Sequence, residues 1–146
     1  MIKKRFHFFV AVHAFFIKSG KVLLLKRANT GYMDGFYSVP AGHVDGGESI
    51  STAMNREIDE EVGITLGKPL EPYLAMHRLI SANEERIDYF FKIRKWIGNP
   101  QNLESNKSSS LEWHDCNNLP KNTIPYVEFA LNAVLEKRHF VEFSEV

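Results

Sequence analysis

The chain has 146 residues, which suits a single domain over 1–146 with a sizeable core. Lysine and arginine together number 18, as do aspartate and glutamate, so the formal net charge at pH 7 is zero. This balance argues against broad electrostatic binding to a nucleic-acid polymer or an anionic membrane.

The cysteine content and the N-terminus indicate a cytoplasmic protein. Cys116 has no partner for an internal disulfide, and we expect it to be a small filler beside a turn. The apolar run 6–17 follows basic residues, as in a signal peptide, but two histidines interrupt it and no small-residue cleavage site follows. No stretch reaches the roughly 18 to 20 apolar residues that span a bilayer.

The first predicted elements are two strands, 6–17 and 22–25, joined by Ser19 and Gly20 in a hairpin turn. Lys26 and Arg27 end the second strand. A basic pair at the end of a strand could bind phosphate. The same sequence pattern is equally consistent with charges that are simply solvated at a strand end. The polar segment 29–35 then leads into a short strand, 36–39.

An acidic helix follows the glycine-rich segment 42–48. Glu57, Glu60 and Glu61 stand at i, i+3 and i+4, so all three carboxylates project from one face of the helix. Carboxylates packed this closely repel one another unless a cation neutralises them. Clusters of oxygen ligands suit the hard divalent ions Mg²⁺ or Mn²⁺, which also bind phosphate oxygens.

The remaining positions of this helix predict how it packs and where it ends. An apolar row at i, i+4 spacing adjoins the carboxylates and should face the core, while Asp59 points away. Gly63 is expected to end the helix in a left-handed conformation. The row consists of Ile50, Met54, Ile58 and Val62.

The spacing of these residues resembles the Nudix hydrolase family, and in particular its MutT-like members. The family pattern is Gly, five residues, Glu, seven residues, Arg-Glu-aliphatic, one residue, Glu-Glu, one residue, Gly-aliphatic. Every fixed position is met, at Gly42, Glu48, Arg56, Glu57, Ile58, Glu60, Glu61, Gly63 and Ile64.

The resemblance implies a role for each of these positions. Glu57, Glu60 and Glu61 would bind the metal, one of them could activate water, and the Gly42 carbonyl would be a further ligand. Arg56 and Glu48 would form an orienting ion pair. The implied reaction is Mg²⁺- or Mn²⁺-dependent attack of water on a diphosphate joined to another group. Arg27 matches a region where the family commonly has a basic residue.

Beyond the helix, segments 73–80 and 86–96 read as strands that pair with each other. His77 and Arg78 could face the cleft, but a cross-strand or surface role is the favoured interpretation. The polar segment 98–110 resembles a loop that supplies an extra metal-binding glutamate in some Nudix proteins. Glu104 is the first candidate for this ligand, and Glu84 or Glu85 is the second.

The C-terminal part is predicted to hold a final strand, 111–114, and a closing helix, 125–137. Pro125 suits the first turn, and an apolar stripe of Phe129, Ala130, Ala133 and Val134 should face the core. In relatives that hydrolyse nucleoside triphosphates, residues before this helix contact the base. Asn122 and Thr123 occupy that place and could equally cap the helix.

The resemblance implies an α/β (α+β) fold with a mixed β-sheet between helices. It also implies a small-molecule nucleotide substrate and leaves open a homodimer.

The first hypothesis for the substrate is a nucleoside triphosphate, canonical or modified, that is cleaved to the monophosphate and pyrophosphate. ADP-ribose and diadenosine polyphosphate members tend to carry Pro or Tyr where this chain has 79–82, and the adjacent aspartates of enzymes for oxidised purines are absent at 126–127.

Two alternatives to this substrate remain open. One is hydrolysis of nucleotide sugars or other nucleoside diphosphate derivatives. The other is a non-catalytic nucleotide-binding module. Such modules usually lose glutamates of the family pattern, here called the box (residues 42–64), and this chain keeps them all.

Overall fold

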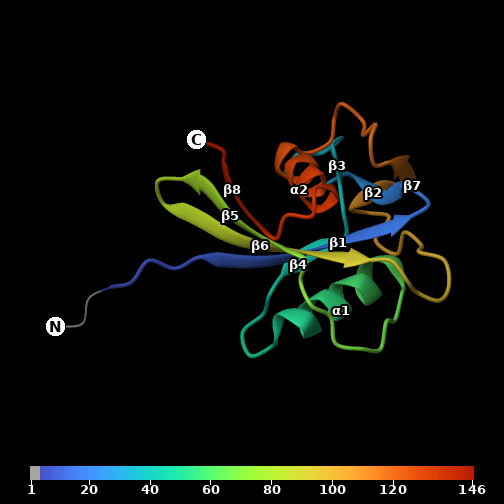
Figure 1. Cartoon of the computed structure of the whole chain (residues 1–146), viewed down its shortest axis with the longest axis horizontal. Coiled ribbons are helices and arrows are strands. Elements are labelled where there is room, and N and C mark those ends of the chain that lie inside the picture. Colours follow the sequence, from blue (N-terminus) through green and yellow to red (C-terminus); the bar gives the residue numbers. More distant parts are fainter. Residues whose placement is uncertain (1–3) are drawn as a thin grey trace.

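The structure, a computed structural model, describes residues 4–146. These residues form a mixed sheet with helix α1, Ile50–Val62, on one face and helix α2, Pro125–Leu135, on the other (Figure 1). The layers match the fold expected from the sequence. The strands are β1 Phe9–Lys18, β2 Lys21–Arg27, β3 Tyr37–Ser38, β4 Ala41–His43, β5 Leu74–Ser81, β6 Glu84–Ile93, β7 Ser108–Asp115 and β8 Phe140–Ser144.

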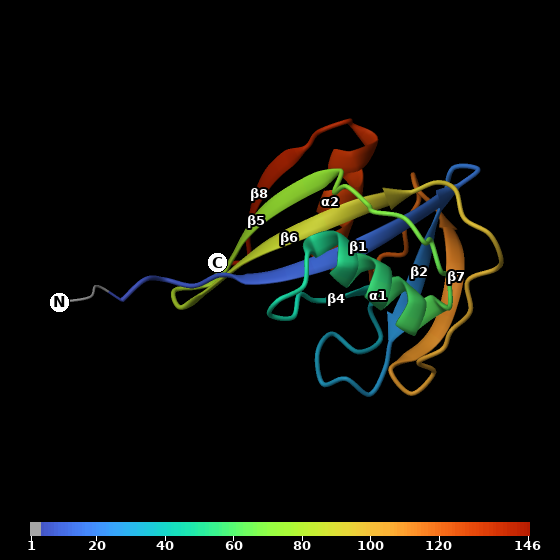
Figure 2. The same cartoon turned by 90° about the horizontal axis from the view of Figure 1, so that it is seen from below.

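The sheet runs in the order β3, β2, β1, β6, β5, β8, while β4 pairs with β1 and β7 pairs with β2. The β1–β6 and β5–β8 pairs are parallel, and the other pairs are antiparallel. Strand β1 is therefore central, with β6 on one side and β2 and β4 on the other. This arrangement brings β4 next to α1, as Figure 2 shows.

The continuous apolar run of β1 follows from burial on both faces of the sheet. Val12, Ala14 and Phe16 belong to the cluster packed on α1, whereas Phe15 packs with the cluster around α2. Side chains alternate between the faces of a strand, so both sets are buried when helices cover both faces. Most of the predicted run is therefore a core strand, but β1 begins at Phe9 rather than at residue 6, and Phe6, Phe8 and Phe9 are exposed.

Local signals in the sequence also form as expected. Ser19 and Gly20 have φ angles of 53° and 74° and close the β1–β2 hairpin between Lys18 and Lys21. Helix α1 begins after Ser49, whose hydroxyl accepts from the Thr52 N–H, and Gly63 ends it with φ of 70°. Strands β5 and β6 pair antiparallel, which confirms that prediction.

Three expectations near the C-terminus are corrected by the structure. Strand β7 is not the last strand, because β8 follows α2 and pairs parallel with β5. Helix α2 ends at Leu135, and Phe129 is 37% exposed rather than part of the buried stripe. The buried face of α2 instead includes Tyr126, Val127 and Leu131 beside the predicted alanines and Val134.

Arg78 is buried, at 2% exposed, so of the two roles favoured for it, cross-strand or surface, it has the cross-strand one. Its Nε donates to Asp88 Oδ2 at 2.8 Å, and His13 Nε2 lies 2.9 Å from Asp88 Oδ1. Burial opposes ionisation of Asp88, but these hydrogen bonds and positive charges outweigh it and lower its pKa to about 2. His77, in contrast, pairs across the strands with Glu85 at 2.7 Å.

Within residues 4–146, no helix has the length and apolar character needed to cross a membrane. Cys116 is buried, and its N–H donates to the Gly20 carbonyl beside the hairpin turn, in agreement with the filler role.

Candidate active site

The predicted metal-binding glutamates lie where α1 packs against β4. Gly42, in the middle of β4, faces the Glu57 carboxylate so closely that a Cβ at this position would overlap it. Pairing of β4 with Ala11–His13 of β1 fixes the position of this backbone. The sheet therefore holds the Gly42 peptide directly against the acidic face of the helix.

Glu61 is the most enclosed carboxyl of the group. Its Oε2 accepts from the Ala41 N–H at 2.8 Å, which ties the last turn of α1 to β4. Burial and, second, the negative charge of Glu57 raise the pKa of Glu61 to about 8. Burial also raises the pKa of Glu57, against the opposing effect of Arg56.

The Arg56 guanidinium joins Glu48 to Glu57. Its Nη2 donates to Glu48 Oε1 at 2.7 Å, and its Nη1 donates to Glu57 Oε1 at 2.8 Å. These contacts raise the pKa of Arg56, and the hydrogen bond from Arg56 lowers the pKa of Glu48. Arg56 also lies 3.5 Å from Glu60 Oε2 and 3.4 Å from Asp45 Oδ2, so it pairs with four carboxylates. The expected ion pair of Arg56 and Glu48 is present.

Glu104 lies near these carboxylates, on the loop that precedes β7. The Leu103 N–H donates to the Glu61 carbonyl at 3.1 Å, which fastens the loop to the C-terminal end of α1. The charge of Glu104 contributes to the raised pKa of both Glu57 and Glu61. The tertiary structure therefore gathers an acidic cluster consisting of Glu57, Glu60, Glu61 and Glu104.

Lys107 is a residue of this site that the sequence analysis missed. Its Nζ lies 3.6 Å from Glu104 Oε2, and its positive charge partly offsets the raised pKa of Glu61. The Ala28 N–H donates to the Lys107 carbonyl at 2.8 Å, so this lysine also borders the segment after Arg27. The only signal in the sequence is its i, i+3 spacing from Glu104.

The chemistry of the acidic cluster fits a divalent metal ion. All candidate ligands are oxygens, which hard divalent ions prefer. The raised pKa values of Glu57 and Glu61 mean that their ionised forms are destabilised, and a bound cation would stabilise them. Within residues 4–146, no three His, Cys, Asp or Glu side chains already surround a common metal position. The reason is geometric, because Glu57 turns to Arg56 and Glu61 to the Ala41 N–H.

Of the predicted substrate-binding residues, Arg27 and Asn122 contact segment 29–35, whereas Thr123 contacts Pro120 and Tyr37. Arg27 Nε donates to the Tyr32 carbonyl at 2.8 Å, and its guanidinium lies over the Tyr32 ring. Asn122 Nδ2 donates to the Gly35 carbonyl at 2.8 Å. Thr123 is buried and donates to the Pro120 carbonyl. Helix α2 has no side-chain cap, so neither Asn122 nor Thr123 caps it.

Glu84 and Glu85, the second-choice candidates for a metal ligand, lie away from the acidic cluster. Glu84 pairs with Arg86 at 2.8 Å, and Glu85 pairs with His77, both at the β5–β6 hairpin. The hairpin projects away from α1 in Figure 1. Glu104 is the candidate that the structure brings to the other carboxylates.

A family model described as the NUDIX domain matches residues 7–133. The chain belongs to the NUDIX family. Among solved structures, a MutT NUDIX hydrolase from Burkholderia pseudomallei is 27% identical, with a TM-score of 0.78, and the match covers 88% of this chain and 98% of that one. A MutT protein from Bacillus halodurans is 22% identical, with a TM-score of 0.74, over 93% and 89% of the two chains, and shows the same fold.

Two curated relatives match over shorter segments. An ADP-ribose pyrophosphatase from Methanocaldococcus jannaschii is 42% identical over 55 residues, which are 38% of this chain. An RNA pyrophosphohydrolase from Acidiphilium cryptum is 40% identical over 53 residues, or 36% of this chain. Each match spans 32% of the relative's own length.

Proposed function

We propose that this NUDIX protein hydrolyses a nucleoside triphosphate, canonical or modified, to the monophosphate and pyrophosphate with Mg²⁺, which Mn²⁺ could replace. The observation that carries the proposal is the acidic cluster held against the Gly42 backbone, with Glu57 in contact with Arg56. The MutT NUDIX hydrolase from Burkholderia pseudomallei, matched over most of both chains, supports the hydrolase class. The choice of a triphosphate rests on the resemblance of the sequence to MutT-like members.

In this reaction the chain positions the phosphates and the water. A divalent ion bound by Glu57, Glu60, Glu61, Glu104 and the Gly42 carbonyl would neutralise phosphate charge. Arg56, held by Glu48, keeps Glu57 oriented.

One carboxylate of the acidic cluster takes a proton from the attacking water. The water oxygen bonds to the α- or β-phosphorus as the anhydride bond between them breaks. Pyrophosphate leaves with the bonding electrons in the first case, and the nucleoside monophosphate in the second. Arg27, Asn122 and Thr123 are the proposed substrate-binding residues.

A second candidate substrate is a nucleoside diphosphate derivative such as ADP-ribose or a nucleotide sugar. The observation that favours it is the 42% identity with an ADP-ribose pyrophosphatase, although the match covers a third of that protein. A non-catalytic nucleotide-binding module is disfavoured, because all four box glutamates are present. The single-domain organisation, the homodimer, the cytoplasmic location and the lack of binding to membranes or nucleic-acid polymers stay predictions from the sequence.

The proposal is tested by product analysis. The purified protein is incubated with Mg²⁺ and a panel of canonical and oxidised nucleoside triphosphates, ADP-ribose, nucleotide sugars and dinucleoside polyphosphates, and the products are separated by chromatography. Pyrophosphate and a monophosphate from one triphosphate are expected. Cleavage confined to a diphosphate derivative would replace the substrate, and ligand binding without any turnover would favour the binding module.

A further inference from the structure

A cavity of about 560 Å³ lies where the end of β6 meets the segment between α1 and β5. Its volume falls within the range of roughly 300–1,000 Å³ that is common for small-molecule sites. Four basic residues line it, and no aspartate or glutamate of residues 4–146 does. The four are Lys68, Lys92, Arg94 and Lys95.

Among residues 4–146, no carboxylate lies within 4.0 Å of any of the four, as is the case for most other lysines and arginines of the chain. The Lys92 ammonium lies over the Tyr73 ring, which packs with the core cluster on the α2 side of the sheet. This leaves Lys68, Arg94 and Lys95 as the cations of the cavity. In a chain of zero net charge, three unpaired cations around one cavity create a local positive potential that attracts anions.

The walls of the cavity are held in place by the fold. Ile93 is buried, and Leu66 and Leu70 pack partly against the core cluster beneath α1, which gives the cavity an apolar floor. Asn55 Nδ2 donates to the Lys68 carbonyl at 3.0 Å, and the Leu70 N–H donates to Ser51 Oγ at 2.7 Å. The segment that carries Lys68 is therefore fastened to α1 at two points.

The cavity is separate from the acidic cluster. Glu57 and Glu61 face β4, whereas the segment fastened by Ser51 and Asn55 follows the opposite flank of α1. Figure 2 shows β4 on one side of α1 and the segment leading to β5 on the other. A ligand could therefore occupy the cavity while the acidic cluster holds another.

We propose that this cavity is a second anion site that binds a diphosphate group without a metal ion. The cations bind the phosphate oxygens, and the apolar floor can accept a nucleoside attached to them. The shared chemistry is that of a diphosphate, whose source is inorganic pyrophosphate or a nucleoside diphosphate. The site is independent of the reaction proposed above, since none of its lining residues belongs to the acidic cluster.

The test is calorimetric titration of the full chain with inorganic pyrophosphate, and separately with ADP, in the presence of EDTA. Chelation keeps divalent ions from the acidic cluster, whose carboxylates then repel phosphate. We expect one pyrophosphate site whose affinity falls with added salt and falls about tenfold or more in K68Q/R94Q/K95Q. ADP that binds more tightly than pyrophosphate, with the same sensitivity to the variant, identifies the nucleotide as the source.

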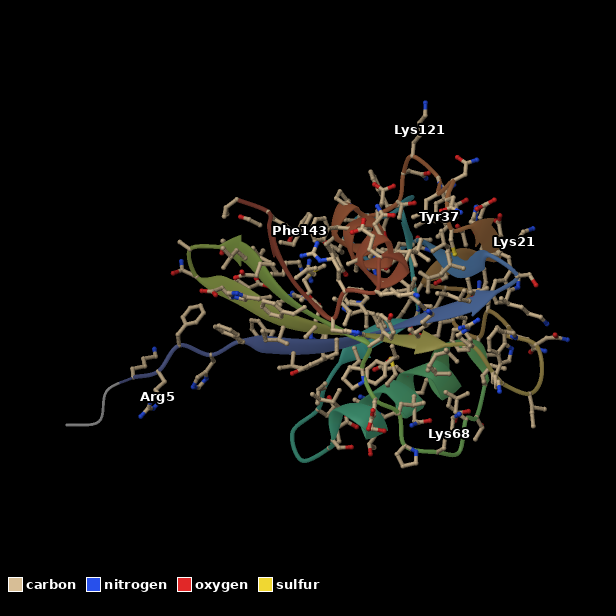
Figure 3. The ribbon with its side chains drawn as sticks, in the orientation of Figure 1. Arg5, Lys21, Tyr37, Lys68, Lys121 and Phe143 are labelled. Atoms are coloured by element: carbon tan, nitrogen blue, oxygen red, sulfur yellow. The ribbon has the colours of Figure 1, made fainter. Side chains whose placement is uncertain are left out.

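The matched control is K18Q/K21Q/K121Q, which removes the same charge from exposed lysines. Figure 3 shows Lys68 on the α1 side of the sheet, and Lys21 and Lys121 away from it. The control should bind pyrophosphate as the wild type does, and both variants should keep the wild-type rate of nucleotide hydrolysis. No binding by the wild type, or binding that K68Q/R94Q/K95Q leaves unchanged, would overturn the proposal.

Discussion

At Gly42 the absence of a side chain has a direct chemical consequence. A Cβ here would overlap the Glu57 carboxylate, so Gly42→Ala must displace a proposed metal ligand or bend β4. We expect the hydrolytic rate to fall at least about tenfold, as when catalytic groups are misplaced by about 1 Å. Gly46→Ala is the control, because a Cβ at Gly46 meets open space. Equal rates for the two variants would contradict this account of Gly42.

The carboxylates of Glu60 and Glu61 are expected to be essential for turnover. Glutamine keeps their size but cannot become a negatively charged metal ligand, so E60Q/E61Q should lose metal binding and at least about a hundredfold in rate. Steady-state kinetics at several Mg²⁺ concentrations check this, with Asp59→Asn as the control for an exposed acid on the same helix. Full activity of the double variant would refute the assignment of the metal site.

Lys107 is expected to contact the negatively charged substrate, because it stands beside Glu104 at the edge of the acidic cluster. Lys107→Gln should lower kcat/KM about tenfold, the cost of a lost charge-assisted hydrogen bond. Lys107→Arg, which keeps the positive charge, should retain most of the activity. If both variants act like the wild type, Lys107 serves only to pair with Glu104.

At the scale of the elements, the start of α1 sets the position of the whole box. The Ser49 hydroxyl accepts from the Thr52 N–H at 3.0 Å and satisfies one of the free donors at the helix N-terminus. Ser49→Ala should lower the free energy of unfolding by about 1 kcal/mol, measured by urea denaturation. Ser49→Asp offers another acceptor and should match the wild type. An unchanged midpoint for Ser49→Ala would show that packing alone fixes the start of the helix.

The hairpin of β5 and β6 illustrates how a buried charge ties elements together. Arg78 on β5 pairs with Asp88 on β6, and its guanidinium carbon lies 3.6 Å from the centroid of the Tyr126 ring on α2. His13 brings β1 to the same carboxylate. One aspartate thus connects two other strands of the sheet and, through Arg78, the covering helix.

For the whole molecule, this network predicts loss of stability in acid. The pKa of Asp88 is about 2 in the folded chain, below the ordinary value of 3.8 that it regains on unfolding. Because the folded pKa is the lower one, the stabilisation is complete above about pH 4 and is lost as the pH falls toward 2. The shift corresponds to about 2 kcal/mol.

Urea denaturation between pH 2 and pH 5 measures this effect. Asp88→Asn should be less stable at neutral pH by roughly 3 kcal/mol, because it leaves Arg78 buried without its charge partner. It should also lose the part of the pH dependence that comes from this carboxyl. A variant with the same acid profile as the wild type would place the titrating group elsewhere.

The sequence by itself determined the features that depend on near neighbours in the chain. The spacing of Glu57, Glu60 and Glu61, the apolar row of α1, Gly63 and the Ser19–Gly20 turn all act over four residues or fewer, so helical and turn geometry fix them. The box also indicated the family, and with it the layers of the fold. The strands β5 and β6 were recognisable from their composition and pair as predicted.

Only the tertiary structure decided which distant residues meet. It brought Glu104 and Lys107 to α1, buried Arg78 on Asp88, placed β8 beside β5, and left Glu84 and Glu85 at a remote hairpin. These contacts depend on which strands and loops become neighbours in space. Which strands and loops become neighbours depends on the burial of apolar surface across the whole sheet. This free energy is summed over residues far apart in the chain, so no local sequence pattern contains it.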